Sequence, residues 1–144
     1  MSIQFMINPP KTIREAVYQG LKSYNARHLP EGEVYSVACF EQDEQLQVIG
    51  GLTGEVFQTT LFIEYLWVDE AHRASGLGSA LMKKTEAEVQ KLGVCDLFLD
   101  TYTFQAREFY IRMGFEEVGR YSDFPAKGID KIFMQKRLPA LKPE

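Results

Sequence analysis

The stretch from residue 61 to residue 82 restricts the possible folds more than any other part of the chain. It begins with eight almost continuously apolar residues, LFIEYLWV, a pattern typical of a central strand covered on both faces. A polar turn, DEAHRAS, follows, and Gly76 and Gly78 then open a segment with helical apolar spacing. Since residues 95–100 again alternate as a strand, we expect a strand–helix–strand unit with two parallel neighbouring strands and a right-handed crossover.

The remaining apolar patterns place further helices and strands around that unit. We expect helices over residues 12–28, 76–92 and 104–113, and strands over residues 34–40, 46–52, 61–68, 95–100, 115–121 and 130–137. Glycines at positions 50, 51 and 54 suggest β-bulges in the second strand, which residues 55–58 extend or bend. The 144 residues suit a single domain, residues 1–144, of the α/β or α+β class in three layers.

Composition excludes several classes of protein. With 45% hydrophobic and 25% charged residues, the chain can bury enough apolar surface to fold, unlike a disordered chain. A formal charge of −4 argues against nucleic acid as a partner, because such interfaces need a basic stripe. No stretch approaches roughly 18 apolar residues, so we expect no membrane-spanning helix. The first ten residues do not resemble a secretory signal, and we expect a cytoplasmic protein.

The cysteines and histidines do not form a pattern that would bind metal. Cys39 and Cys95 each sit in an apolar strand pattern, and we interpret both as small buried hydrophobic residues rather than nucleophiles. His28 and His72 share no ligand spacing with either cysteine. We therefore predict that the protein uses no metal.

The glycines at the start of the helix over residues 76–92 indicate a binding site for an anion. A helix start presents unpaired N–H groups and the positive end of its dipole, and glycine lets a phosphate approach them closely. Neither the G-x-x-x-x-G-K-[ST] motif nor the dinucleotide fingerprint fits, since Leu81 stands where the latter needs Gly or Ala. The alternative is that Gly76 and Gly78 only permit close packing of helix on strand.

Three motifs, in order, resemble those of the GNAT superfamily of N-acetyltransferases. Residues 73–78 (RASGLG) resemble its R/Q-x-x-G-x-G/A signature, and residues 66–70 (LWVDE) resemble the lead-in L-x-V-x-P-E. Residues 106–115 are similar to the element A-x-x-x-Y-x-x-x-G-F. The resemblance runs through roughly residues 34–138. It departs at Thr103, where many members have Asn near the CoA chain.

The resemblance implies a fold and a donor substrate. The implied fold is a mixed, largely antiparallel sheet with a splayed parallel strand pair and helices on both faces. The donor would be acetyl-CoA, with its pyrophosphate on the amides of residues 73–79 and its pantetheine arm against the splayed strand. The expected cofactor-binding residues are Leu66, Trp67, Val68, Arg73, Ala74, Ser75, Gly76, Gly78 and Ser79.

Glu64 is the candidate general base. It is the only charged residue inside LFIEYLWV, and a carboxylate in a buried strand is costly unless it is paired or functional. Desolvation would raise its pKa toward the range useful for a base. The resemblance supports this strand and face, although the family's glutamate usually sits two residues earlier, at the position of Phe62. The alternative role for Glu64 is a buried ion pair.

Tyr110 is the candidate general acid, since the resemblance places a tyrosine here beside the CoA sulfur. Its position on an apolar stripe allows the alternative of a core tyrosine. The Val68 N–H suits a developing oxyanion. Trp67 should point to the face opposite Glu64 and belong to the core.

These residues predict an N-acetyltransferase in which a primary amine attacks acetyl-CoA directly in a ternary complex. The acceptor is a small-molecule or peptide amine, and a homodimer is compatible with the family. The alternative is a non-catalytic acyl-CoA-binding regulatory module with the same fold.

Overall fold

The computed structural model describes residues 1–141 and divides the chain into two compact units, Met1–Gly32 and a second that starts at Glu33. The first unit contains α1 (Lys11–Asn25), which begins after Pro10. It ends three residues earlier than predicted, because the amides of Arg27 and His28 bond to carbonyls only three residues back and close the last turn.

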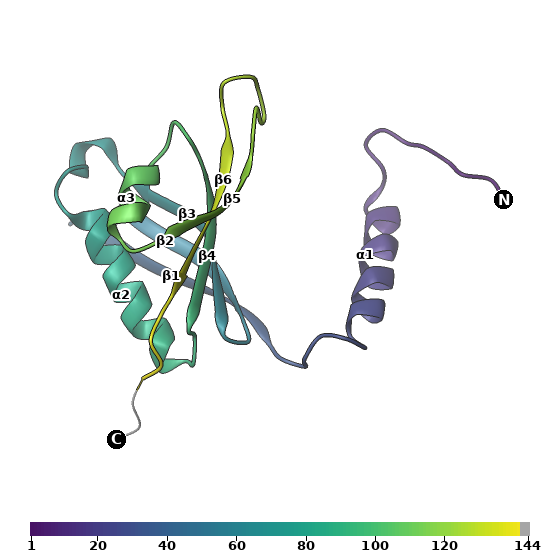
Figure 1. Ribbon diagram of the computed structural model, residues 1–144, viewed down its shortest axis with the longest axis horizontal. Coiled ribbons are helices and arrows are strands. Elements are labelled where there is room, and N and C mark those ends of the chain that lie inside the picture. Colours follow the sequence, from purple (N-terminus) through teal and green to yellow (C-terminus); the bar gives the residue numbers. More distant parts are fainter. Residues whose placement is uncertain (142–144) are drawn as a thin grey trace. The chain divides into compact units, whose positions relative to one another are not determined.

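The second unit is built on a six-stranded sheet with the strand order β1-β2-β3-β4-β6-β5 (Figure 1). Only β3 and β4 are parallel, and the other neighbours are antiparallel. The strands are β1 (Val34–Gln42), β2 (Val48–Phe57), β3 (Thr60–Val68), β4 (Asp96–Tyr102), β5 (Glu116–Tyr121) and β6 (Lys131–Arg137). The predicted mixed sheet with one parallel pair is confirmed.

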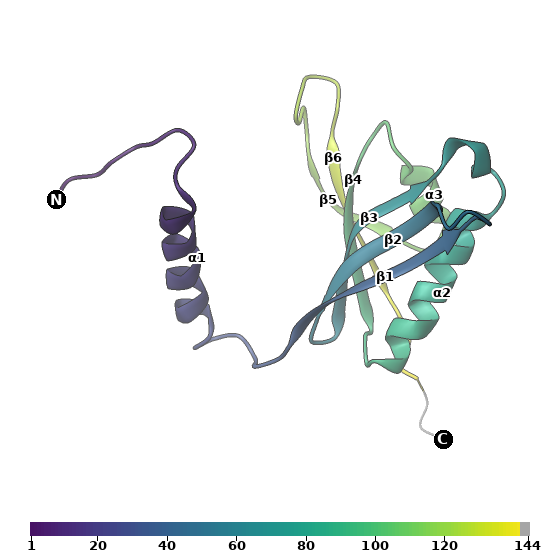
Figure 2. The same cartoon turned by 180° about the vertical axis from the view of Figure 1, so that it is seen from behind.

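Two helices accompany this sheet, α2 (Leu77–Lys91) and α3 (Arg107–Arg112), and both are seen from the opposite side in Figure 2. α2 lies in the crossover between β3 and β4, as predicted. A short 3-10 turn, Glu70–His72, precedes it. α3 begins three residues later than predicted, because the Gln105 side chain bonds to the end of β4 and holds the preceding residues in a turn.

A β-bulge in β3 opens the sheet between β3 and β4. Ile63 pairs with Gly54 and Tyr65 pairs with Thr53, so Glu64 is an extra residue without a partner on β2. The parallel pairing of β3 with β4 covers only three residue pairs and stops at Phe62, just before the bulge. The two strands therefore diverge toward their C-terminal ends, which is the splay that the sequence resemblance implied.

Gly54 is the residue that permits this bulge. A Cβ at Gly54 would lie 2.4 Å from the carbonyl oxygen of Phe62 on β3. A second register shift between β1 and β2 leaves Ile49 unpaired. The bulges expected from the glycines of β2 are thus present, but the one at Gly54 carries its extra residue on the neighbouring strand.

One hydrophobic core joins the sheet to both helices of the second unit. Buried side chains from the strands meet Met82 and Val89 of α2 and Tyr110 of α3. The strand residues are Leu52, Val56, Leu61, Ile63, Leu97, Leu99, Ile132 and Met134. They alternate along each strand, as expected for a sheet with one face in the core. The core therefore holds the N-terminal parts of β3 and β4 together, while their C-terminal ends stay apart.

Three burial predictions are wrong. β3 is not covered on both faces along its whole length, since Tyr65 is 72% exposed and Trp67 is 48% exposed beyond the bulge. Trp67 is consequently not a core residue. Cys95 is exposed rather than buried, because it lies in the turn just before β4.

In residues 1–141, no helix has the length and apolar character needed to cross a bilayer. The same residues contain no group of three or more His, Cys, Asp or Glu side chains placed to hold a metal ion.

Candidate active site

Two adjoining pockets lie where β3 and β4 diverge. The first, of about 700 Å³, extends over the start of α2 toward α3 and β6. The second, of about 820 Å³, lies between the C-terminal ends of β3 and β4 and the start of α3. Both are lined by Val68, Arg73, Gly78 and Phe109, so they form one continuous depression. We call them the helix-start pocket and the strand-end pocket.

The helix-start pocket has a backbone suited to an anion. Ala74 and Gly76 both adopt positive φ values, 62° and 84°, which fold the turn before α2 back on itself. The first helical bond runs from the Ala80 amide to the Gly76 carbonyl, and no side chain caps the helix. The amides of residues 77–79 therefore have no partner in the helix and can donate to a ligand.

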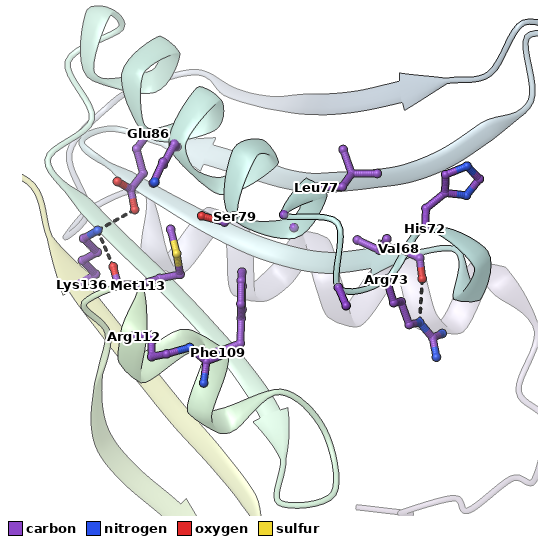
Figure 3. Close-up of a pocket in the computed structure, with 14 residues that line it drawn as sticks. Val68, His72, Arg73, Leu77, Ser79, Glu86, Phe109, Arg112, Met113 and Lys136 are labelled. Atoms are coloured by element: carbon purple, nitrogen blue, oxygen red, sulfur yellow. Dashed lines mark hydrogen bonds and ion pairs between the residues drawn. The ribbon is translucent and has the colours of Figure 1, made fainter.

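Basic side chains surround this backbone (Figure 3). Arg73, Lys83, Arg112 and Lys136 line the pocket together with one carboxylate, Glu86. The Arg73 Nε donates to the Val68 carbonyl at 3.0 Å. Lys136 is held by the Glu86 carboxylate at 2.8 Å and by the Met113 carbonyl at 2.6 Å. The positive charge of this pocket suits phosphate groups.

Gly78 lines both pockets, and the protein's own packing does not require a glycine there. A Cβ built on it would lie 3.6–3.8 Å from the nearest atoms of Phe109 and Val68, which is ordinary contact. Its φ is also not positive. The alternative interpretation, that this glycine only permits close helix packing, thus loses its support at Gly78. The absent Cβ leaves the Gly78 backbone uncovered between the Phe109 and Val68 side chains, where it lines both pockets.

The structure brings together most of the sequence-predicted cofactor residues. Six of them line the helix-start pocket, Val68, Arg73, Ala74, Gly76, Gly78 and Ser79. Leu66 and Trp67 line the strand-end pocket. Ser75 lines neither pocket, and its hydroxyl donates to the His72 carbonyl.

The register of β2 and β3 decides which backbone groups face the opening. The Asp69 amide bonds to the Ile49 carbonyl at 2.8 Å. In an antiparallel ladder the bonded pairs alternate, so Val68 and Leu66 point their N–H and C=O groups away from β2, toward the diverged β4. Trp67 instead directs its backbone to β2. The Leu66 N–H and C=O and the Val68 N–H are thus free to pair with a ligand, whereas the Val68 carbonyl already accepts a hydrogen bond from the Arg73 Nε.

Glu64 and Tyr110 line the same strand-end pocket, although they are 46 positions apart in the sequence. The burial expected for Glu64 is wrong: as the extra residue of the bulge it is exposed, so it does not form the buried ion pair that was its alternative role. The bulge instead places a carboxylate at the mouth of the pocket.

Tyr110 is 7% exposed, and its ring makes edge contacts with Phe109 and Phe115. Burial raises the pKa of its phenol above 10.0. Every fully buried side-chain N or O atom of the described residues has a hydrogen-bond partner. Tyr110 therefore belongs to the core cluster because its ring is buried against these two phenylalanines, and the same residue also lines the strand-end pocket.

Sequence reasoning missed four pocket residues that come from the end of β4 and the turn after it: Asp100, Thr101, Phe104 and Gln105. The Gln105 Oε1 accepts hydrogen bonds from the Thr101 hydroxyl and the Tyr102 amide, which fixes this turn. The rule that ligands bind beyond the carboxyl ends of parallel strands could have identified them. Thr103, the departure from the family motif, donates its amide to the Asp130 carbonyl and so supports the loop before β6.

Comparisons with known proteins agree with this geometry. Residues 5–115 match the model of the acetyltransferase (GNAT) family. The chain is 37% identical to a blasticidin-S acetyltransferase of Streptomyces morookaense, over 74% of this chain and 76% of that protein. It is 29% identical to an acetyltransferase of Agrobacterium fabrum, over 85% and 89% of the two chains.

A crystal structure of an acetyltransferase from Bacillus cereus is similar with a TM-score of 0.85 and 32% identity, covering 94% of this chain and 98% of that one. The family model spans well over half of the 144 residues. The protein is therefore an acetyltransferase of the GNAT family.

Proposed function

We propose that this protein transfers the acetyl group of acetyl-CoA to a primary amine by direct attack at the splayed ends of β3 and β4. One observation carries the proposal: Glu64 and Tyr110 line a single pocket that is continuous with the basic pocket at the start of α2. A long donor with phosphates at one end and a thioester at the other can occupy both pockets at once.

The residues present fit such a donor. Free amides at the start of α2, basic side chains and the missing Cβ of Gly78 suit its phosphates. The outward-facing backbone groups of Leu66 and Val68 suit its amide-containing arm. When bound, acetyl-CoA supplies an acetyl group already activated as a thioester.

Each proposed catalytic group then has one task. Glu64 attracts the acceptor's ammonium group and removes its proton, directly or through water. The Val68 N–H donates to the carbonyl oxygen as negative charge develops on it. Tyr110 donates its hydroxyl proton toward the leaving sulfur. The raised pKa of Tyr110 keeps that proton in place throughout the neutral range.

We propose a small-molecule amine as the acceptor, rather than a peptide. The relative named blasticidin-S acetyltransferase, at 37% identity, supports a small-molecule acceptor. The carboxylates of Glu64 and Asp100 in the strand-end pocket suit a cationic amine.

The test is the release of free CoA thiol from acetyl-CoA with a panel of amines that includes blasticidin S, polyamines and peptide N-termini. We expect saturable turnover with at least one cationic small molecule. Calorimetry with CoA in parallel separates the outcomes, since tight CoA binding without turnover of any amine would favour the regulatory module.

A further inference from the structure

An exposed aromatic side chain stands at the edge of the strand-end pocket. Phe104 is 68% exposed and lines this pocket. Its ring is stacked on the Tyr102 ring, with 5.4 Å between centroids and only 8° between planes. Stacking fixes the plane of the Phe104 ring, and its exposed side is accessible to a ligand in this pocket.

The surrounding bonds hold Phe104 in this position. On one side the Gln105 side chain bonds to Thr101 and Tyr102 at 2.9 Å and 2.8 Å. On the other side the Thr103 amide donates to the Asp130 carbonyl at 3.0 Å, and the Asp130 amide donates to the Thr103 hydroxyl at 3.2 Å. Phe104 thus lies between two fixed residues, which lowers the entropy lost when a ligand stacks on it.

The charges near Phe104 differ from those of the helix-start pocket. Among residues 1–141, the strand-end pocket is lined by two carboxylates, Glu64 and Asp100, and by one cationic residue, Arg73, which lies at the boundary that the two pockets share. Asp100 is half-buried, and its ion pair with Lys131 is long, at 3.6 Å. The acceptor side of the depression therefore combines a flat ring with negative charge.

We propose that Phe104 is a specificity residue that selects acceptors carrying a flat aromatic or heteroaromatic ring next to their cationic amine. The ring stacks on Phe104 as a third layer above Tyr102, and the carboxylates of Glu64 and Asp100 draw the ammonium group toward the donor. This inference rests on the proposed acetylation of small-molecule amines in this pocket.

The experiment compares 2-phenylethylamine and 2-cyclohexylethylamine, which share the ethylamine chain and carry a planar aromatic ring or a saturated ring, with the wild-type protein and the Phe104→Leu variant. We expect wild type to prefer the aromatic amine in kcat/KM by about tenfold, the size of one good stacking contact. The Leu variant should reduce this preference to near unity, mainly through KM, and Phe104→Trp should restore it. Phe40→Leu, at an exposed aromatic of β1 that lines neither pocket, is the matched control and should keep the preference.

An equal loss for both amines in Phe104→Leu would overturn the proposal, because a residue that only supports the fold does not distinguish planar from saturated rings. If neither amine is acetylated, the proposed function fails for these acceptors, and the subsite is then judged by calorimetry of the same two amines on the CoA-loaded protein. Equal affinities in that measurement would overturn the subsite itself.

Discussion

At the scale of single residues, Tyr110 shows how one side chain can serve both the core and a pocket. Its ring packs edge-on against Phe109 and Phe115, so the sequence interpretation as a core residue and the proposed role as an acid are compatible. Burial raises the pKa of its phenol, which widens the gap to a thiol of pKa about 8.5. A proton between two groups of unequal pKa stays mainly on the group with the higher pKa, so burial makes Tyr110 a weaker proton donor to the sulfur than an ordinary tyrosine would be.

For Tyr110→Phe we expect kcat to fall about 100-fold, the lower end of the range for a general acid, with CoA affinity little changed. The ring contacts are kept, so the variant should fold. Because burial raises the pKa of Tyr110, the alkaline fall in wild-type kcat caused by its ionisation should lie at higher pH than for an ordinary tyrosine. A pH–rate profile with a separate CoA titration checks both points, and a kcat within twofold of wild type would leave Tyr110 a core residue only.

Gly78 gives a second residue-scale prediction. In Gly78→Ala the new methyl group makes only ordinary contacts with Phe109 and Val68, so the free energy of unfolding should change by less than about 1 kcal/mol. The same methyl group fills the space next to the helix-start amides, and CoA affinity should fall roughly tenfold or more. Calorimetry and urea unfolding measure the two effects. Unchanged affinity in a folded variant would place the phosphates elsewhere.

At the scale of elements, the splay depends on a bulge that is shared by two strands. Glu64 supplies the extra residue on β3, and Gly54 on β2 leaves room for the bent backbone. The sequence predicted a bulge from the glycines of β2. It could not predict that Glu64 would be exposed, because LFIEYLWV has the composition of a fully buried strand and the extra residue changes which face each side chain takes.

Gly54→Ala tests this dependence. Its Cβ would meet the Phe62 carbonyl at 2.4 Å, so the backbones of β2 and β3 must shift. We expect the variant to lose about 1–3 kcal/mol in its free energy of unfolding, measured by urea titration. Gly93→Ala is the comparison for a clash-free position: its Cβ meets nothing within 4 Å, so only the strain of a positive φ acts there. Equal stability of Gly54→Ala and wild type would mean that the bulge adjusts without cost.

At the scale of the whole molecule, the element order, the parallel pair and the helix-start pocket were predictable because each follows from a local pattern or a motif. The lining of the strand-end pocket by the end of β4 was not predictable. Asp100, Phe104 and Gln105 carry no motif, and they become pocket residues only because β4 leaves β3 after Phe98. Their role depends on the distance between two strands, which periodicity and residue spacing do not encode.

The free protein can also be regarded as a sheet with an internal edge, since the outward backbone groups of Leu66 and Val68 lack the strand that would normally cover them. Amide hydrogen exchange measures whether the backbone amides of Leu66 and Val68 are uncovered. Without ligand, the Leu66 and Val68 amides should exchange like those of an edge strand, whereas the Trp67 amide between them should be protected by β2. Added CoA should slow Leu66 and Val68 and leave Trp67 unchanged. The donor would then complete the protein's own sheet, and the order of β3 beyond its bulge would depend on whether the enzyme is loaded.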